Sequence, residues 1–585
     1  MSARSGILMA CAFFLGAMTT SVLGALPATG AGALDPTFGD EGKVVFDPLP
    51  GSDNDGIHPG VVQPDGKLVV TGYIERDGAD AAILVARFLD GGAPDPEFGT
   101  DGVAIHAIDE SAYADSRRVA VTAGGRILVV GSARSSGVFR CVVLALRPDG
   151  SLDPTFATGG IFRHPAPGTA GNQCLNIAVQ ADGKLVVLGN ADSYKSNFLL
   201  RLSAAGVLDN SFGNQGVATL PGTTTNYVYG LSLTPAGAIY LCGGKADGTS
   251  PGVVYRYTAA GVLDATFANG GQYATPVTNV FLHDIEALPD GSAVASGYHS
   301  GKHLVLKLTP AGVPAAGFGV NGMQEITLGS GYSAVSLELQ RDGRILAGLQ
   351  LNSSSGWRFA VARLTAAGAL DPTWGTAGIS QLDLGTPEEG LTGIALGPDG
   401  KLWVFGNTYP SDNESAIAIA RLLPDQITTN VVEFFNTGLV HYFITADPNE
   451  AAAIDAGAAG PGWMRTGQTF KSGGPNKVCR FYGNPDLNPA TGTRRGPNSH
   501  FYTIEAAECA AVKLDDGWRF ESYDFNGWPI GPAGCPAGTQ PVMRAYNNRF
   551  AQNDSNHRYT TSTAIYDQMI ADGWSGEGTV FCAAL

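Results

Sequence analysis

The sequence lacks the short motifs that mark most enzyme classes. Its 585 residues contain no His-Glu-x-x-His, no Gly-x-Ser-x-Gly followed by triad partners, no P-loop and no Cys-x-x-Cys. Isolated Gly-x-Gly matches fall in loops of a chain with 80 glycines and are not informative. The sequence therefore favours a protein without catalytic activity, and the open alternative is an enzyme whose site is assembled from scattered residues.

Basic side chains are scarce. The chain has 36 Lys and Arg against 53 Asp and Glu, a formal net charge of -17, and its isoelectric point is near 4.9. An acidic surface repels phosphate groups, so neither nucleic acid nor an anionic membrane is an expected partner. Beyond the N-terminus no apolar run approaches the roughly 18 residues of a membrane-spanning helix, so we expect no membrane insertion once an N-terminal signal is removed.

The N-terminus has the pattern of an export signal. Arg4 is followed by an apolar stretch at residues 7–18 and then by small residues, with candidate cleavage sites at 22–24 and 31–33. The stretch is short for a membrane span, which makes an uncleaved anchor helix the weaker interpretation. We predict a signal peptide at residues 1–33 and a secreted protein, extracellular or periplasmic.

Seven cysteines remain after Cys11 leaves with the signal, and export permits them to form disulfides. Four of them lie in the last 107 residues, where we expect two bridges whose connectivity the spacing leaves open. These four are Cys479, Cys509, Cys535 and Cys582. Cys141 and Cys174 are candidates for a third bridge between neighbouring strands, which leaves Cys242 as a buried thiol in an apolar run.

One phrase returns seven times along the first three quarters of the chain. It opens as Leu-Asp-Pro-Thr-Phe-Gly at residues 34–39 and recurs at intervals of 51 to 60 residues. Its aromatic anchors are Phe38, Phe98, Phe156, Phe212, Phe267, Phe318 and Trp374. A period of this size, carried by turn residues and short apolar runs, indicates a repeat array.

Each repeat contains four short runs rich in Val, Ile and Leu, the pattern of β-strands. Asp-Gly pairs such as Asp65-Gly66 and Asp399-Gly400 mark tight hairpins, and no stretch shows sustained helical periodicity. Seven units of four strands predict a seven-bladed β-propeller over residues 34–425, with a parallel β-helix as the rival fold. Residues 43–46 are expected to complete the blade that contains residues 416–422, which would close the ring.

The phased features together resemble the delta-60 repeat of secreted bacterial proteins. The resemblance covers residues 34–423 and rests on Leu-Asp-Pro-Thr-Phe-Gly, then Pro-Asp-Gly-Lys-Leu-Val-Val, then a closing Arg-Leu. It implies a propeller and an extracellular or cell-surface setting, and it implies no activity. Two repeats depart from the pattern, at residues 314–317 and at Ala268, and we expect altered corners there.

The Asp of the phrase recurs at one phase and invites two interpretations. Carboxylates suit calcium, so a ring of calcium-binding loops is one possibility, although each phrase supplies only one carboxylate. The favoured interpretation is that each Asp caps its own turn and that the aromatic residue wedges between blades. No cofactor is therefore predicted, and calcium is the less favoured alternative. The Asp residues are Asp35, Asp95, Asp153, Asp209, Asp264 and Asp371.

A different, three-fold repeat fills residues 431–585. Each unit reads as strand, strand, short helix and strand, with expected helices near residues 449–456, 504–514 and 564–571. Three such units are needed to build one core, so we predict a small α+β domain, stabilised by disulfides. The pattern His-aromatic-Tyr-Thr, then Gly-Trp, resembles an uncharacterised C-terminal module of secreted bacterial proteins that follows varied partner domains. That association implies attachment or binding.

Two groups of side chains in this region are candidate ligand-binding residues. His441, His500 and His557 lie at equivalent positions of the three-fold repeat, where three imidazoles would suit a metal ion. Trp463, Trp518 and Trp574 offer aromatic faces on which sugar rings stack. The plainer interpretation of both groups is structural: each His bonds nearby backbone, and each Trp packs in the core. We name no catalytic residue, and any metal is left undetermined.

The sequence favours a secreted or cell-surface binding protein, a monomer, that recognises polysaccharide, cell wall or another surface protein. One alternative is a propeller enzyme, either a metal-assisted hydrolase or an oxidoreductase, with its site in the central channel. The other is a purely structural surface protein.

Overall fold

The computed structural model describes residues 31–585 apart from short gaps. These gaps are residues 50–54, 77–79, 109–112, 136, 165–170, 192–195, 222–225, 246–249, 329–333, 341, 354–355, 412–413, 425–428, 475, 485–491, 493–494, 532–533, 537, 550–551 and 553. The predicted signal peptide lies almost entirely outside the described residues.

The first 28 strands hydrogen-bond in sets of four, the arrangement of β-propeller blades. The first three sets are β2 (Asp55–Val62), β3 (Leu68–Arg76), β4 (Asp80–Phe88), β5 (Val103–His106); β6 (Tyr113–Val121), β7 (Ile127–Ser135), β8 (Val138–Leu146), β9 (Ile161–Arg163); and β10 (Asn172–Val179), β11 (Leu185–Ala191), β12 (Ser196–Leu202), β13 (Val217–Thr219). The first two sets join into one eight-stranded sheet through a single parallel pair, Ala81 with Tyr113.

The remaining sets follow the same order along the chain. They are β14 (Asn226–Leu233), β15 (Ile239–Lys245), β16 (Val253–Tyr257), β17 (Gln272–Ala274); β18 (Val280–Ala287), β19 (Ala293–His299), β20 (Lys302–Leu308), β21 (Met323–Ile326); β22 (Ala334–Leu339), β23 (Ile345–Ser353), β24 (Gly356–Leu364), β25 (Ile379–Leu382); and β26 (Glu388–Leu396), β27 (Leu402–Ser411), β28 (Glu414–Leu422) with β1 (Lys43–Phe46). Over the described residues this makes seven sets.

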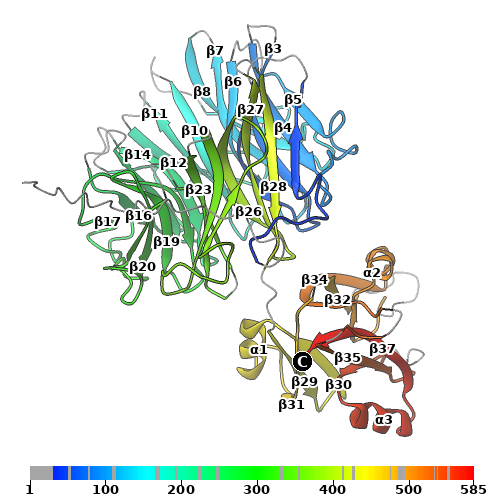
Figure 1. Cartoon of the computed structure of the whole chain (residues 1–585). Helices are drawn as coiled ribbons and strands as arrows, with labels where there is room; N and C mark the ends of the chain where they lie inside the picture. The colour runs from blue at the N-terminus through cyan, green and yellow to red at the C-terminus, as the bar shows by residue number, and fades with distance from the viewer. Residues whose placement is uncertain are drawn as a thin grey trace, which may run out of the picture.

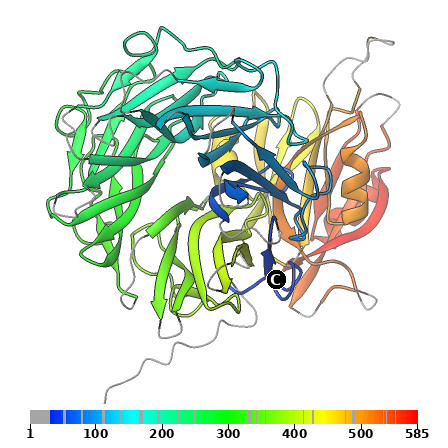
Figure 2. The same ribbon diagram turned by 90° about the horizontal axis from the view of Figure 1, so that it is seen from above.

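The sets close into a ring. The first strands β2, β6, β10, β14, β18, β22 and β26 each contact the next in this order, and β26 contacts β2. Figures 1 and 2 show the sheets following one another around this ring. The last set takes its outer strand from the start of the chain, because β1 pairs with β28 from Lys43↔Ala420 to Phe46↔Ile417. The predicted closure between the two ends of the repeat region is confirmed.

The first strand of every set carries a register shift opposite the middle of the second strand, at nearly the same place. In the second set the register shifts between Ser116 and Arg118, opposite Gly131. A Cβ atom at Gly131 would lie 2.1 Å from the carbonyl oxygen of Asp115. Glycine is therefore required where the bulged backbone approaches the second strand. This explains the glycine that ends the Leu-Val-Val run of the repeat.

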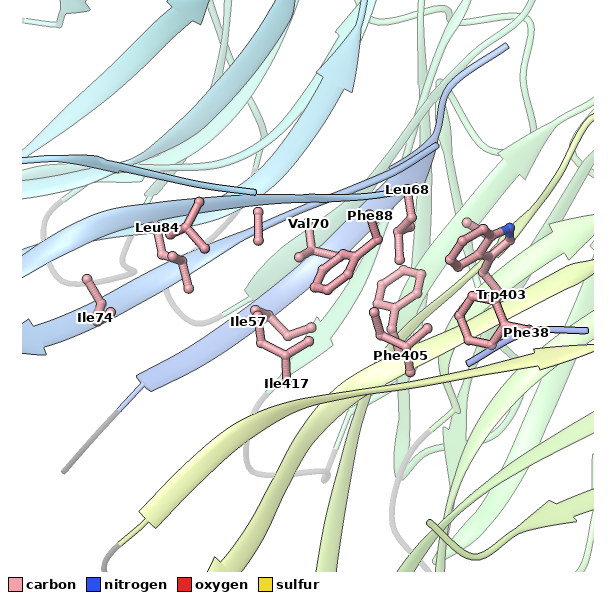
Figure 3. Packing of buried hydrophobic residues seen from close by; sticks show 14 of the residues in the cluster. Phe38, Ile57, Leu68, Val70, Ile74, Leu84, Phe88, Trp403, Phe405 and Ile417 are labelled. Atoms are coloured by element: carbon pink, nitrogen blue, oxygen red, sulfur yellow. The ribbon is translucent and has the colours of Figure 1, made fainter. Parts of the chain in front are cut away.

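The aromatic anchors wedge between neighbouring sets, as predicted. All seven are at most 2% exposed. Figure 3 shows Phe38, the first of the seven anchors, packed against Trp403 of the last set, with ring centroids 4.9 Å apart. The same cluster contains Leu68 and Phe88 from the first set. Each anchor thus buries apolar area that belongs to two sets, which couples their stability.

The repeated Asp residues cap their own turns and also bind arginine. Asp35 Oδ1 accepts hydrogen bonds from the backbone and the hydroxyl of Thr37, at 3.0 and 2.7 Å. Its Oδ2 lies 2.8 Å from both Arg421 Nε and Lys401 Nζ. The Arg421 guanidinium in turn lies over the Phe38 ring, 4.7 Å from its centroid. We call this arrangement of Asp, Arg and aromatic ring the corner.

Corners of this kind recur around the ring. The Asp–Arg contacts are Asp95–Arg87, Asp209–Arg201, Asp264–Arg256 and Asp371–Arg363, at 2.7 to 2.9 Å. Asp153 instead binds Arg126 from the hairpin of its own set, at 2.6 Å. The residue after each anchor donates its backbone N–H to the turn that closes the next set, as Gly99 does to Asp149 O at 2.9 Å and Gly375 does to Ala31 O at 2.9 Å. The corner therefore joins consecutive sets as well as closing its own turn.

The two departures from the repeat keep the backbone geometry of their corners, and the predicted alteration is found only in the side chains of the second, which lacks the Asp–Arg pair. Ala268 has a φ of 45°, close to the 52° of Gly39, and it donates to Ala311 O at 2.8 Å. At the other departure Ala315 replaces Asp, yet its N–H still bonds to Lys307 O at 2.9 Å. Lys307 lies over Phe318 at 5.8 Å in place of an arginine. Neighbouring sets impose the backbone geometry even where the local residues disfavour it.

The C-terminal region consists of three strand–strand–helix–strand units, as predicted. They are β29 (Asn430–Asn436), β30 (His441–Thr445), α1 (Pro448–Asp455), β31 (Trp463–Lys471); β32 (Asn476–Gly483), β33 (His500–Thr503), α2 (Ala506–Lys513), β34 (Trp518–Gly527); and β35 (Thr539–Tyr546), β36 (His557–Thr560), α3 (Thr563–Ala571), β37 (Ser575–Ala584). Asp447 and Ser562 cap α1 and α3. Residues from all three units share one core, which includes Val431, Val478 and Val542.

The disulfides resolve what the spacing left open. Cys479 pairs with Cys509, and Cys535 pairs with Cys582. The predicted bridge between Cys141 and Cys174 is confirmed, and Cys242 is free and buried. No helix in the described part of the chain is long and apolar enough to span a membrane.

The corner formed by Asp35, Arg421 and Phe38, which we call the closing corner, leads to a prediction about Asp35. Burial alone would raise the pKa of Asp35, but hydrogen bonds from Lys401 and Thr37 outweigh it and lower the pKa to about 2. Asp35→Asn removes one charge partner of buried Arg421 and leaves it Asp90 at 2.6 Å, so we expect a loss of about 1–3 kcal/mol in the free energy of unfolding at pH 7. Because the folded pKa lies below the unfolded value of about 3.9, the difference should shrink as the pH falls from about 4 to about 2.

Thermal and denaturant unfolding of both proteins across this pH range measures the effect. The matched control is Asp65→Asn, since Asp65 caps an exposed hairpin through a single hydrogen bond to Lys67 N. An equal loss in the two variants would contradict a special role for the corner.

Candidate functional site

The three units of the C-terminal domain superpose in register when counted from Thr445, Thr503 and Thr560. His500 pairs with Tyr482, and His557 pairs with Tyr546, three residues before the threonine. His441 lies one residue earlier in its unit and pairs with Asn436. Adjacent strand residues point to opposite faces, so the prediction of three equivalent imidazoles is wrong. Tyr442 occupies the position of the other two histidines.

The histidines bind separate carboxylates. His441 Nε2 lies 2.7 Å from Asp554 Oδ1, and His500 Nε2 lies 3.3 Å from Glu521 Oε2. Burial, with Arg544 nearby, lowers the pKa of His557 to about 3. Among the described residues no group of three or more His, Cys, Asp or Glu is arranged to hold a metal ion. The candidate metal site at these histidines is therefore not formed.

Equivalent aromatic pairs repeat in the three units. Phe435 packs on Tyr442, Tyr482 on His500 and Tyr546 on His557, with ring centroids 4.8 to 5.0 Å apart. The three tryptophans are half-buried and pack at 5.6 to 6.3 Å against Phe443, Phe501 and Tyr442. Each Trp is thus partly buried against an aromatic ring and partly exposed, between the two interpretations that the sequence left open.

Two junctions between units use an arginine over an aromatic ring. Arg480 of the second unit lies 5.4 Å from the Phe443 centroid of the first. Arg544 of the third unit lies 4.9 Å from the Phe501 centroid of the second. The junction from the third unit back to the first replaces the ring with Arg558 and the arginine with Glu433. These two form a bidentate ion pair at 2.8 and 2.9 Å. The exchanged pair thus marks the junction at which the third unit meets the first.

A cavity of about 490 Å³ lies between the first and second units. Phe443, Glu450 and Trp463 of the first unit line it together with Tyr482, His500 and Glu521 of the second. His441, Asn498 and Ser499 also reach it. Its size is within the range of about 300–1,000 Å³ that holds small molecules. The cavity brings three of the predicted site residues together, His441, His500 and Trp463. The other three, Trp518, Trp574 and His557, do not line it.

Charges are fixed along one wall of this cavity. Arg480 binds Glu450 at 2.7 Å and Glu521 at 3.0 Å. Burial alone would raise the pKa of Glu521, but His500 and Arg480 outweigh it and lower the pKa, so the carboxylate stays ionised. The Tyr482 hydroxyl donates to Asn498. The wall therefore combines aromatic faces with oriented acceptors, a combination that binds hydroxyl groups well.

The ring carries a second polar cluster on its inner strands. Arg118 of β6 reaches Asp284 of β18, which belongs to a set three places further along the chain, at 3.2 Å. Burial and the Asp284 charge raise the pKa of Glu286 to about 7. Burial, Glu286 and Asp284 raise the pKa of Glu338 well above its usual value. The sequence did not reveal this cluster, because the residues that meet there lie up to 220 positions apart.

Two family models match the chain. One is described as a domain of unknown function (DUF5122) beta-propeller and matches residues 63–98, 125–156, 180–212 and 340–373. The other is described as a domain of unknown function (DUF5648) and matches residues 406–524 and 492–584. The chain thus carries a β-propeller match in its N-terminal region followed by a DUF5648 match. A search of curated proteins found no significant match.

Solved structures that resemble the chain have diverse roles. An unknown-function protein from Dyadobacter fermentans is 12% identical (TM-score 0.36), covering 67% of this chain and 100% of its own. A PQQ-bound aldose sugar dehydrogenase from Streptomyces coelicolor is 12% identical (TM-score 0.31), covering 68% and 100%. Chaetomium thermophilum Sqt1, bound to the N-terminus of ribosomal protein L10, is 13% identical (TM-score 0.35), covering 62% and 84%. At these values no activity or partner transfers to this chain.

The closing junction of the C-terminal domain generates a paired prediction. Glu433→Arg places two guanidinium groups together, and Arg558→Phe leaves Glu433 buried without its partner, so each should cost about 3–5 kcal/mol of stability. The double variant recreates the arginine-over-ring contact of the other two junctions. It should recover more than half of the summed loss.

Denaturant unfolding of the wild type, both single variants and the double variant forms a double-mutant cycle. Losses that simply add in the double variant would show that the ion pair is not coupled as described.

Proposed function

We propose that this is a binding protein whose C-terminal domain holds a neutral sugar ring in the cavity between its first two units. The observation that carries the proposal is the placement of Trp463, Phe443 and His500 beside the ionised Glu521 in one cavity. Aromatic faces cover the apolar face of a sugar ring, and carboxylates accept hydrogen bonds from its hydroxyl groups. An acidic wall disfavours an anionic sugar, so the ligand class is neutral polysaccharide.

The setting that fits this function is outside the cytoplasm. Three disulfides suit an oxidising compartment. The export pattern at residues 1–33 points the same way. The repeat resembles the delta-60 family of secreted proteins, and we take each set of four strands as one blade, seven in all. In this proposal the propeller is the body of a secreted or cell-surface monomer, and the C-terminal domain attaches it to polysaccharide.

The inner-strand carboxylates support a second candidate, a propeller enzyme. Glu286, with its pKa near 7, suits a proton donor or acceptor at neutral pH. Release of soluble sugars from the polysaccharides that the protein binds would favour this candidate. Binding without release favours the attachment role, and neither result would favour a purely structural protein.

Substitution of Trp463 tests the proposed cavity. The purified chain is mixed with insoluble chitin, cellulose and β-1,3-glucan, three neutral polysaccharides, and the bound fraction is measured. Trp463→Ala should weaken binding about tenfold or more, since loss of about 1.4 kcal/mol of stacking corresponds to tenfold in affinity. Trp518→Ala is the matched control, because Trp518 occupies the same place in the second unit without lining the cavity.

Unfolding curves of both variants separate loss of contact from loss of fold. Equal binding by the two variants, or failure of the wild type to bind any of the three polymers, would contradict the proposal.

A further inference from the structure

A second cavity, of about 340 Å³, lies between the second and third sets of the ring. Five strands contribute to it: β6, β7, β8, β10 and β11. The disulfide between Cys141 of β8 and Cys174 of β10 crosses the same junction. Asn172 Oδ1 accepts a hydrogen bond from Cys141 N at 2.8 Å, which fixes the cavity floor beside the bridge. A covalent link between its two walls holds the cavity in shape.

The floor of this cavity is polar, buried and incompletely bonded. Asp115, Ser132, Asn172 and Asn190 line it and are each at most 3% exposed. In the described part of the chain, Ser132 Oγ and Asn190 Nδ2 have no hydrogen-bond partner, and Gln173 Oε1 at the wall has none either. A buried polar group without a partner destabilises the fold. These donors and acceptors therefore fit a ligand that carries several hydroxyl groups.

An equivalent residue elsewhere in the ring shows what a purely structural amide does at this position. Asn407 of the last set follows the bulge glycine Gly406 as Asn190 follows Gly189. Asn407 Oδ1 accepts from Ile57 N at 2.7 Å, and its Nδ2 donates to Ile57 O at 3.3 Å. Both ends of that amide bind the neighbouring set. Asn190 lines a cavity, and its Nδ2 group has no such partner.

The rim of the cavity is cationic and aromatic. Arg117 and Arg134 lie there with Tyr113 and Phe139, whose rings meet edge to face at 6.1 Å. Asp115 binds Arg117 at 2.9 Å and His58 at 3.2 Å, so the floor carboxylate is held in place. Two guanidinium groups against one carboxylate leave the lining positive. This contrasts with the net formal charge of -17 on the whole chain.

We propose that this cavity binds a uronic acid, a sugar ring that carries a carboxylate, as a free acid or as a unit of an acidic polysaccharide. The unpaired Ser132 and Asn190 groups of the floor bind the hydroxyls. The rings of Tyr113 and Phe139 cover the sugar face. The guanidinium groups at the rim bind the carboxylate, the geometry that arginine recognises best. The cavity is close to the lower end of the size range of small-molecule sites, which suits a single ring.

Calorimetric titration of the full chain with D-glucuronate and D-glucose tests the proposal, because this pair differs only in the carboxylate. D-galacturonate is added as a second acid. We expect glucuronate or galacturonate to bind at least tenfold more tightly than glucose, with affinity that falls as salt rises. Arg134→Gln, at the exposed rim, should abolish the preference for the acid. Asn190→Ala should weaken acid binding at least fivefold.

Trp463→Ala is the control that separates this site from the proposed polysaccharide cavity, and it should leave binding of the acids unchanged. The proposal is overturned if neither acid binds, or if glucose binds as tightly as the acids. It is also overturned if Arg134→Gln, which lies at the surface and should not disturb folding, retains the acid preference.

Discussion

The structure depends on a contact that recurs around the ring, an arginine or lysine that lies over a buried aromatic anchor, most often held there by the Asp that caps the anchor's turn. At the closing corner Arg421, from the end of the repeat region, meets Asp35 and Phe38, from its beginning. The Asp and Arg of a corner belong to the same set, and the arginine reaches the next set by donating to a backbone carbonyl there, as Arg87 does to Pro148 O and Arg201 does to Ala259 O. Each corner is therefore complete only when both sets are in place. These contacts join the sets into one closed ring in which only short strand edges remain exposed.

The C-terminal domain also joins its last repeat unit to its first, but it uses different residues. Two junctions repeat an arginine over a ring, and the third replaces both partners with Glu433 and Arg558. A fully symmetric set of junctions would not distinguish the ends of the array, whereas one exchanged pair defines which units meet. In both parts of the chain, then, the cavities described above lie at junctions between repeats. The two cavities have opposite charge, acidic beside Glu521 and basic beside Arg134.

Much of the fold could be predicted from the sequence, because its signals are local. Asp-Gly hairpins and alternating apolar runs located the strands, and the helices began within two residues of Asp447-Pro448 and Thr561-Ser562. The pairing of residues 43–46 with β28 followed from the need to remove sheet edges. The site residues were harder to predict. His441 lies one residue earlier in its unit than His500 does, so its side chain points to the opposite face of the sheet. The sequence spacing did not show this shift. Tyr482, Glu521 and Asn190 became visible as site residues only when distant strands met, and no local pattern marks them.

Hydrogen exchange of the native protein tests the central claim most directly. If the corners join neighbouring sets and close the ring, the Gly39 amide and those amides of residues 44–46 that donate to β28 should exchange as slowly as the corner amides of Gly99 and Gly213 inside the array. All of them should then open together in one cooperative transition. Rapid exchange of the Gly39 amide and of these β1 amides, while the interior corners remain protected, would contradict the account.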